Sequence, residues 1–281
     1  MVEGSEHHEY DAVVIGAGVS GMYQLYRLRQ MGLRALVLEA GTGVGGTWYW
    51  NRYPGARFDS ESYTYGYSWS PEILAEWDWT ERFSPQPENL RYLEFVADRF
   101  DLRRDMRFES VVTAARYDDA SNEWYVETAD GYRTRSRYLI TAIGALSVPV
   151  MPAIDGIDEF TGPSFHTSNW PKEEVSFEGK RVAVIGTGAT AVQLIPEVAK
   201  TVGHLTVYQR TPNWCAPLHN GPIEAEEMAD IKTRYQEIFD TCNGTFAGFQ
   251  HVPDRRKALE ISAEERRELW ERLWGEPGFG I

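Results

Sequence analysis

Short apolar runs, each followed by glycines and then by a helical pattern, occur twice along the chain. The first copy has apolar runs at residues 11–15 and 35–38, and the second has them at 182–185 and 205–208. Between the two runs of each copy, apolar positions follow the spacing of an amphipathic helix. Apolar runs of this length are typical of buried parallel strands. Each copy therefore predicts a β-α-β unit.

Other segments predict a meander and further helices. Residues 107–144 alternate apolar and polar positions between turn signals at 118–122 and 130–131, which predicts a β-meander. Its last strand, at 138–142, is apolar and is expected to return to a buried sheet. By the same kind of pattern, helices are predicted at 88–99, near 224–240 and at 262–274, where Ser262 and Glu265 match a capping box.

Two β-α-β units in one chain predict an α/β protein with two Rossmann-like dinucleotide-binding folds, a β-meander and a helical segment at its C-terminal end. We predict a first domain at residues 1–145 and a second at 146–281, which begins with a proline-containing linker. Only helical patterns follow residue 208, whereas a second fold of this kind needs more strands. Each fold is therefore expected to be incomplete here, as in the front part of a longer protein or in a truncated relative.

Charge and composition narrow the functional classes. The 281 residues carry a formal net charge of -14, which argues against a protein that binds the nucleic-acid backbone. The first residues lack the pattern of a secretory signal and no stretch approaches a membrane span, so a soluble, cytoplasmic protein without a membrane partner is expected. The two cysteines, Cys215 and Cys242, have no metal-ligand or C-x-x-C spacing. Neither a metal site nor a dithiol redox centre is expected.

The first glycine cluster matches G-x-G-x-x-G through Gly16, Gly18 and Gly21. In this fingerprint the first glycine permits a tight turn, the second lets the backbone approach a pyrophosphate, and the third lets helix and strand pack closely. Glu39 follows the second strand, where a carboxylate accepts hydrogen bonds from ribose hydroxyls. The cluster predicts an adenine dinucleotide site; the alternative is a purely structural glycine turn.

The second cluster has Gly186, Gly188 and Ala191, and alanine is allowed at the third position. No acid follows its second strand; Gln209 and Arg210 stand there instead. A guanidinium group pairs with phosphate oxygens, so this replacement favours the 2′-phosphate of NADP over NAD. The alternative is a solvated surface arginine.

A third candidate is Asp59, a lone carboxylate among aromatic residues, flanked by Arg52 and Arg57. Gly45 and Gly46, just upstream, would let the backbone approach a cofactor closely. Asp59 could hold a catalytic or cofactor-binding cation. The alternative is an aspartate that caps a turn.

Four motifs together resemble the type I Baeyer–Villiger monooxygenases: GAGVSG at 16–21, GGTWYWNRYPGARFDSES at 45–62, FTGPSFHTSNWP at 160–171 and GTGATA at 186–191. These flavoproteins use NADPH and O2 to insert one oxygen atom next to a ketone carbonyl, which yields an ester or lactone. The family fingerprint is carried here by Phe160, Gly162, His166 and Trp170. The chain resembles the front half of phenylacetone, steroid and cyclohexanone monooxygenases.

The resemblance implies FAD in the first fold and NADPH in the second, with a small-molecule ketone and O2 as partners. Cofactor-binding residues that it implies in the first fold are Gly16, Gly18, Val19, Ser20, Gly21, Glu39, Gly46, Thr47, Trp48, Arg57, Asp59, Tyr65 and Val112. Those that it implies in the second are Gly186, Thr187, Gly188, Ala189, Thr190, Gln193, Arg210 and Thr211.

Asp59 is the implied catalytic residue, which would orient and electrostatically tune an arginine from a later part of the family's sequence. No residue of this chain matches that arginine. Phe58 departs from the family, which usually has a smaller residue before the aspartate.

The fingerprint at 160–171 follows a linker and is expected to form a junction between the two nucleotide domains. Phe160 and Trp170 would pack the corner, while His166 makes hydrogen bonds that depend on the domain arrangement. A role of His166 as a general base is the less favoured alternative. Two other functions stay open: a flavin monooxygenase that oxygenates nitrogen or sulfur, and an inactive nucleotide-binding fragment that lacks the catalytic arginine.

Overall fold

The computed structural model describes residues 8–251, 254 and 256–278, which form two compact units. The first unit takes the described residues up to Tyr53 together with Asn89–Glu174. The second takes Pro54–Glu88 together with the described residues from Val175 onward. Residues 54–88 therefore group with the second glycine cluster in space, although they follow the first one in sequence. Each unit is described by itself.

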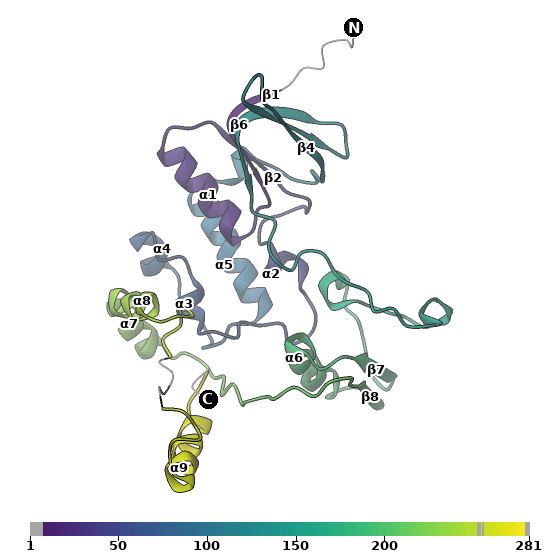
Figure 1. Cartoon of the computed structure of the whole chain (residues 1–281), viewed down its shortest axis with the longest axis vertical. Helices are drawn as coiled ribbons and strands as arrows, with labels where there is room; N and C mark the ends of the chain where they lie inside the picture. Colours follow the sequence, from purple (N-terminus) through teal and green to yellow (C-terminus); the bar gives the residue numbers. More distant parts are fainter. Residues whose placement is uncertain (1–7, 252–253, 255, 279–281) are drawn as a thin grey trace. The chain divides into compact units, whose positions relative to one another are not determined.

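The first unit is built on a sheet with the strand order β3-β2-β1-β6-β5-β4 (Figure 1). Its strands are β1 (His8–Ile15), β2 (Ala35–Leu38), β3 (Met106–Arg107), β4 (Val112–Asp118), β5 (Glu123–Thr128) and β6 (Arg133–Thr141). β1 pairs in parallel with β2 and β6, and β2 pairs in parallel with β3. β4, β5 and β6 are antiparallel to one another in sequence order. Both the β-α-β unit and the meander are confirmed.

Burial explains why the apolar runs form the centre of this sheet. Val13 and Val14 in β1 are fully buried, and all four residues of β2 are buried. Helix α1 (Val19–Gln30) lies against β1 and β2 and buries Leu25 and Leu28 on one face, as its spacing predicts. The prediction of a buried last strand is wrong in part: β6 does pair with β1, but Tyr138 is 47% exposed.

Helices complete the first unit. α5 (Gln86–Arg99) begins two residues earlier than predicted and buries Leu93 and Val96; its first residues belong to the second unit. The shorter helical elements are α2 (Thr47–Trp50), η1 (Arg103–Asp105), η2 (Ile157–Glu159) and η3 (Thr167–Asn169).

In the part of the second unit that the structure describes, a parallel pair of strands, β7 (Arg181–Ile185) and β8 (His204–Tyr208), flanks α6 (Ala189–Val198). The predicted β-α-β unit is confirmed, but its strands are less buried than their apolar sequence predicts. Ile185 and Tyr208 are exposed, because the described residues supply few elements to cover this short sheet. The remaining helices are α3 (Ser62–Tyr65), α4 (Pro71–Glu76), α7 (Ala225–Thr233), α8 (Tyr235–Gly244) and α9 (Ala263–Trp274).

Local signals account for the ends of the later helices. Ser262 and Glu265 form the predicted capping box at the start of α9, with each side chain bonded to the other residue's backbone N–H. The segment predicted to be helical near 224–240 consists of two helices that meet at Arg234. Within the described residues, no helix combines the length and apolar character needed to cross a membrane.

Candidate functional site

The first glycine turn is closely packed between β1, α1 and the end of β6. Gly16 has φ +103°, and a Cβ there would lie 2.6 Å from the carbonyl oxygen of Ala142. A Cβ on Gly21 would overlap the carbonyl oxygen of Gly16 and lie 2.9 Å from its carbon. The turn therefore requires glycine at both positions for steric reasons, beyond any ligand.

A second glycine segment approaches this turn. A Cβ on Gly18 would lie 3.3 Å from the Cα atom of Gly46, and one on Gly46 would lie 2.7 Å from the Cα atom of Gly18. Gly45 donates its N–H to the carbonyl oxygen of Ala17 at 3.0 Å. The first turn of α1 carries no acidic residue, and its leading N–H groups have no partner within a helix. This combination suits an anionic group such as a pyrophosphate.

Glu39 supports the turn directly. It is 5% exposed at the end of β2, and its Oε2 accepts a hydrogen bond from Ala17 N at 2.6 Å. Its Oε1 accepts one from Gly41 N at 2.7 Å. An ionised carboxylate has about four acceptor positions, so capacity remains for ribose hydroxyls. Glu39 thus holds the backbone of the turn, a role that the sequence pattern does not indicate.

Lys172 and Tyr49 form a polar contact beside these residues that the sequence analysis missed. The Tyr49 hydroxyl accepts hydrogen bonds from Thr42 N at 2.9 Å and Lys172 Nζ at 3.0 Å. Burial alone would raise the pKa of Tyr49, but the hydrogen bonds from Lys172 and Thr42 outweigh it, so the pKa is lowered. The position of Lys172 directly after the fingerprint was the only sequence signal available.

The other residues implied for the first fold are distributed unevenly. Val19 and Ser20 lie in the first turn of α1, and Thr47 and Trp48 begin α2 directly after Gly46. Val112 instead begins β4 and packs against the core cluster of the sheet. Arg57, Asp59 and Tyr65 belong to the second compact unit.

The second glycine turn has the same backbone form with more space around it. Gly186 has φ +103° and donates its N–H to the carbonyl oxygen of Tyr208 at 2.8 Å. A Cβ on Gly186 or Gly188 would meet no described atom within 4 Å. The first turn of α6, which contains Ala189 and Thr190, carries no acidic residue. This turn also suits an anion.

Residues after β8 gather at this turn. Thr187 Oγ1 accepts a hydrogen bond from Gln209 Nε2 at 3.1 Å and donates one to the carbonyl oxygen of Thr211 at 3.4 Å. Asn213, which the sequence analysis did not consider, donates its amide to the carbonyl oxygen of Thr187. Arg210 is exposed between them. The structure therefore joins Thr187 and Thr211 by a hydrogen bond, and Arg210 precedes Thr211 in the sequence.

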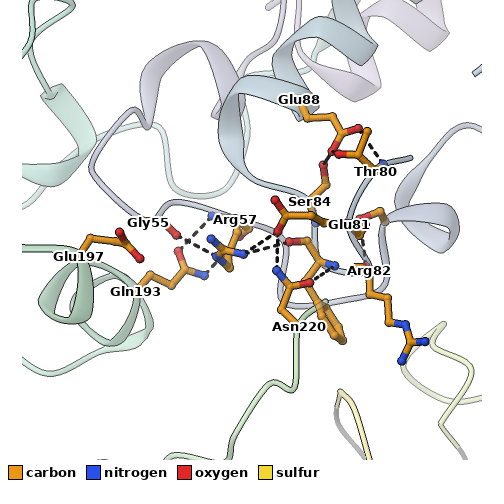
Figure 2. A network of polar contacts seen from close by, with 12 residues as sticks. Gly55, Arg57, Thr80, Glu81, Arg82, Ser84, Glu88, Gln193, Glu197 and Asn220 are labelled. Atoms are coloured by element: carbon orange, nitrogen blue, oxygen red, sulfur yellow. Dashed lines mark hydrogen bonds and ion pairs between the residues drawn. The ribbon is translucent and has the colours of Figure 1, made fainter. Parts of the chain in front are cut away.

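Asp59 lies in the second unit and contacts α6. Its Oδ1 accepts a hydrogen bond from Gln193 Nε2 at 2.7 Å. The two arginines that flank this carboxylate in the sequence each make contacts within their own unit. Arg57 Nη1 pairs with Glu81 at 3.3 Å (Figure 2). Arg52, in the first unit, lies over the ring of Tyr49.

Phe58 fits an aromatic cluster rather than the surface of the unit. It is 2% exposed, and its ring centroid lies 3.9 Å from that of Tyr65 and 5.8 Å from that of Trp79. The large residue before Asp59, a departure from the family, is thus accommodated by local packing. Tyr65 covers one side of it and stays partly exposed.

The fingerprint segment makes local contacts within the first unit. Trp170 has its ring 5.5 Å from that of Phe165, whereas Phe160 is 67% exposed. Within the first unit, the aromatic partner of Trp170 is thus Phe165, and the packing of a domain junction by Phe160 and Trp170 stays a prediction. His166 Nδ1 accepts a hydrogen bond from Ser168 N and contacts its hydroxyl at 2.7 Å, so His166 caps η3. That the hydrogen bonds of His166 depend on the domain arrangement stays a prediction.

Comparisons with known proteins agree with these motifs. A family model described as pyridine nucleotide-disulphide oxidoreductase matches residues 13–263. A 2-oxo-Δ3-4,5,5-trimethylcyclopentenylacetyl-CoA monooxygenase of Pseudomonas putida is 49% identical, over 96% of this chain and 51% of the relative. A Baeyer-Villiger monooxygenase of Pseudooceanicola batsensis is 40% identical, over 96% of this chain and 50% of the relative. A phenazine N-monooxygenase of Lysobacter antibioticus is also 40% identical, over 98% of this chain and 50% of the relative.

Among solved structures, an OTEMO complex with FAD and NADP superposes with a TM-score of 0.93 and 49% identity. The superposition covers 97% of this chain and 52% of that one. The resemblance to Baeyer–Villiger monooxygenases is confirmed, and the chain spans about half the length of the relatives it matches.

Proposed function

Because the chain belongs to the pyridine nucleotide-disulphide oxidoreductase family, we propose that it provides the dinucleotide-binding part of a Baeyer–Villiger monooxygenase. The reaction consumes a ketone, O2, NADPH and a proton, and it yields an ester or lactone, NADP+ and water. The observation that carries this proposal is the pair of glycine turns, each within a β-α-β unit. After the second strand of the unit, the first has an acidic residue and the second has a basic one. Glu39 follows the first turn and Arg210 follows the second.

FAD is the cofactor we assign to the first turn. The close approach of Gly18 and Gly46 leaves backbone next to the start of α1 with no side chain in the way, which fits a pyrophosphate. Glu39 fits the adenosine ribose, because its carboxylate keeps free acceptor positions after binding Ala17 and Gly41. When bound, the flavin transfers electrons from NADPH to O2, while the protein binds and orients.

NADPH is the cofactor we assign to the second turn. The open space over Gly186 and Gly188 fits the pyrophosphate, and the exposed guanidinium group of Arg210 fits a 2′-phosphate. Asp59, which Gln193 holds, is the proposed catalytic residue.

Disulfide chemistry, which the family description includes, is not part of the proposal. Both cysteines are free; Cys215 is exposed and Cys242 is buried. A dithiol reaction needs two thiols within reach of each other. We propose a small ketone and O2 as partners, in the cytoplasm, with no nucleic-acid or membrane partner.

Oxygenation of nitrogen is the second candidate, because one of the relatives, 40% identical to this chain, is named a phenazine N-monooxygenase. The two candidates differ in product and not in cofactors. The fingerprint of Phe160, Gly162, His166 and Trp170, with Asp59, favours the ketone reaction by resemblance.

The proposal is tested in two steps. The purified 281-residue chain should bind FAD, seen as flavin absorbance that stays with the protein on gel filtration, and should bind NADP+ by calorimetry. The longest natural polypeptide that contains the chain should then oxidise NADPH faster when a cyclic ketone is added, with a lactone as product by mass spectrometry. A colourless chain without NADP+ binding would contradict the cofactor assignment, and an N-oxide formed from phenazine without any lactone would favour the second candidate.

Arg210→Ala is expected to weaken NADPH binding about tenfold to a hundredfold and NADH binding by less than about threefold, since charged hydrogen bonds contribute about 1.5–3 kcal/mol. Dissociation constants for both nucleotides, measured by calorimetry, check this. Arg181→Ala removes another exposed arginine of the same unit and serves as the control. Equal losses for NADPH and NADH would overturn the 2′-phosphate assignment.

A further inference from the structure

Helix α6 is joined to the segment that carries Asp59 by one side-chain amide. Gln193 lies in the second turn of α6, and segment 55–59 runs past it within the same compact unit (Figure 2). By resemblance, Gln193 is implied to contact NADPH, which stays a prediction. In the structure, its side-chain amide bonds to this segment.

The amide of Gln193 pairs with the backbone as another strand would. Its Oε1 accepts a hydrogen bond from Arg57 N at 3.3 Å, and its Nε2 donates to Arg57 O at 3.2 Å. The same Nε2 donates to Asp59 Oδ1 at 2.7 Å. Only this orientation of the amide pairs a donor with every acceptor, because a flipped amide would place its oxygen against the carbonyl and the carboxylate.

The other edge of the segment is held independently. Phe58 N donates to Ser84 O at 3.0 Å, and Gln86 N donates to Ala56 O at 2.8 Å. Successive N–H groups thus bond on opposite sides of the segment. Exchange of the Arg57 N–H therefore depends on Gln193, whereas exchange of the Phe58 N–H does not.

A glycine sets the distance between the segment and the helix. Gly55 has φ +84°, and a Cβ there would overlap the carbonyl oxygen of Gln193 and lie 3.0 Å from Glu197 Cγ. Backbone therefore packs on backbone at this point.

The guanidinium group of Arg57 anchors the segment on its far side. Glu81 Oε2 accepts from Arg57 Nη1 at 3.3 Å and from Asn220 Nδ2 at 2.6 Å, and Asn220 Oδ1 accepts from Phe83 N at 3.0 Å (Figure 2). Residues 56–58 are thus held on both sides, and the bond to Gln193 restricts the side chain of Asp59 that follows them.

From these contacts, we propose that Gln193 is a positioning residue that orients Asp59 and links it to the second dinucleotide site. This proposal rests on the proposed function, because α6 begins at the glycine turn assigned to NADPH and Asp59 is the assigned catalytic residue. Binding at the start of α6 would thereby order Asp59 through Gln193 and the Gly55 contact.

The direct test is residue-resolved amide hydrogen exchange of the full chain without cofactors. Gln193→Leu keeps a helix-forming side chain of similar length and removes the amide. The Arg57 N–H should then exchange about fivefold to tenfold faster, whereas the Phe58 N–H should keep its rate. An unchanged Arg57 rate would overturn the proposal. Gln236→Leu, on the exposed face of α8, is the matched control for an added leucine and should alter neither rate.

A second variant keeps the proposal testable if Gln193→Leu fails to fold. Gly55→Ala should also accelerate exchange of Arg57, because its Cβ forces the segment away from α6. Gly179→Ala, also at positive φ (+66°) but with no neighbour within 4 Å, should leave Arg57 unchanged. If both substitutions accelerated Arg57 exchange equally, backbone strain at positive φ would explain the result. That outcome would contradict the close contact between Gly55 and α6.

The link to the cofactor is tested separately with NADP+. NADP+ should slow exchange at residues 57–59 in the natural sequence but not in Gln193→Leu, while its dissociation constant changes less than about threefold. A more than tenfold loss of NADP+ affinity in Gln193→Leu would mean that Gln193 contacts the nucleotide directly, and this would overturn the positioning role. If the natural chain binds no NADP+, the proposed function fails, while the cofactor-free comparison still decides the role of Gln193.

Discussion

Gly21→Ala is expected to destabilise the first compact unit by more than about 3 kcal/mol, one of the largest effects of any single methyl group in the chain. The added Cβ would overlap the carbonyl oxygen of Gly16 and lie 3.5 Å from the Cβ atom of Ala142. The backbone atoms of Gly16, which directly follows β1, cannot move aside as a flexible side chain would. The helix α1 would have to leave its place on the sheet, and FAD binding should be lost with it.

The second unit supplies the control for this prediction. It has Ala191 at the equivalent position, 8% exposed, and Ala191→Gly should cost only about 1 kcal/mol, from the helix propensity of glycine. Urea unfolding followed by circular dichroism, with hydrogen exchange to assign the unit, measures both effects. A loss below about 1 kcal/mol for Gly21→Ala would contradict the packing described for the first turn.

Glu39→Ala is expected to cost about 2–4 kcal/mol and to reduce FAD binding more than a hundredfold. The substitution leaves the N–H groups of Ala17 and Gly41 buried without their acceptor, and each such loss costs about 1–3 kcal/mol. It also removes the acceptor proposed for the ribose. Stability is read from urea unfolding, and flavin affinity from fluorescence titration.

Two comparisons separate the parts played by Glu39. Glu39→Gln keeps one acceptor oxygen and should give an intermediate loss of stability. Glu123→Ala, which breaks the partly exposed ion pair with Arg135, should cost no more than about 1 kcal/mol. If Glu39→Ala destabilised the chain no more than Glu123→Ala, the structural role would be excluded. Retention of full FAD affinity would exclude the ribose role.

The pattern of residues by itself determined the elements whose cause is local. The apolar runs of β1, β2, β7 and β8 and the amphipathic spacing of α1 are properties of consecutive residues. So is the capping box at Ser262, because its two partners lie within one helical turn. Glu39 also follows from local pattern, since it stands where the second strand of a β-α-β unit ends.

Only the tertiary structure decided which distant residues meet. Gln193 and Asp59 are 134 positions apart and Lys172 and Tyr49 are 123 apart, so no periodicity relates them. Segment 54–88 groups with the second unit, although the order of motifs assigned it to the first domain. Its partners there, such as Gln193 and Asn220, lie more than 130 positions further along the chain.

Burial was also decided by tertiary structure. An apolar strand such as β7 or an aromatic residue such as Phe160 is buried only if another element covers it, and that element comes from elsewhere in the chain. Local sequence specifies which face of a strand or helix is apolar. The three-dimensional path of the chain specifies what packs against that face, and hence which side chains hold Asp59.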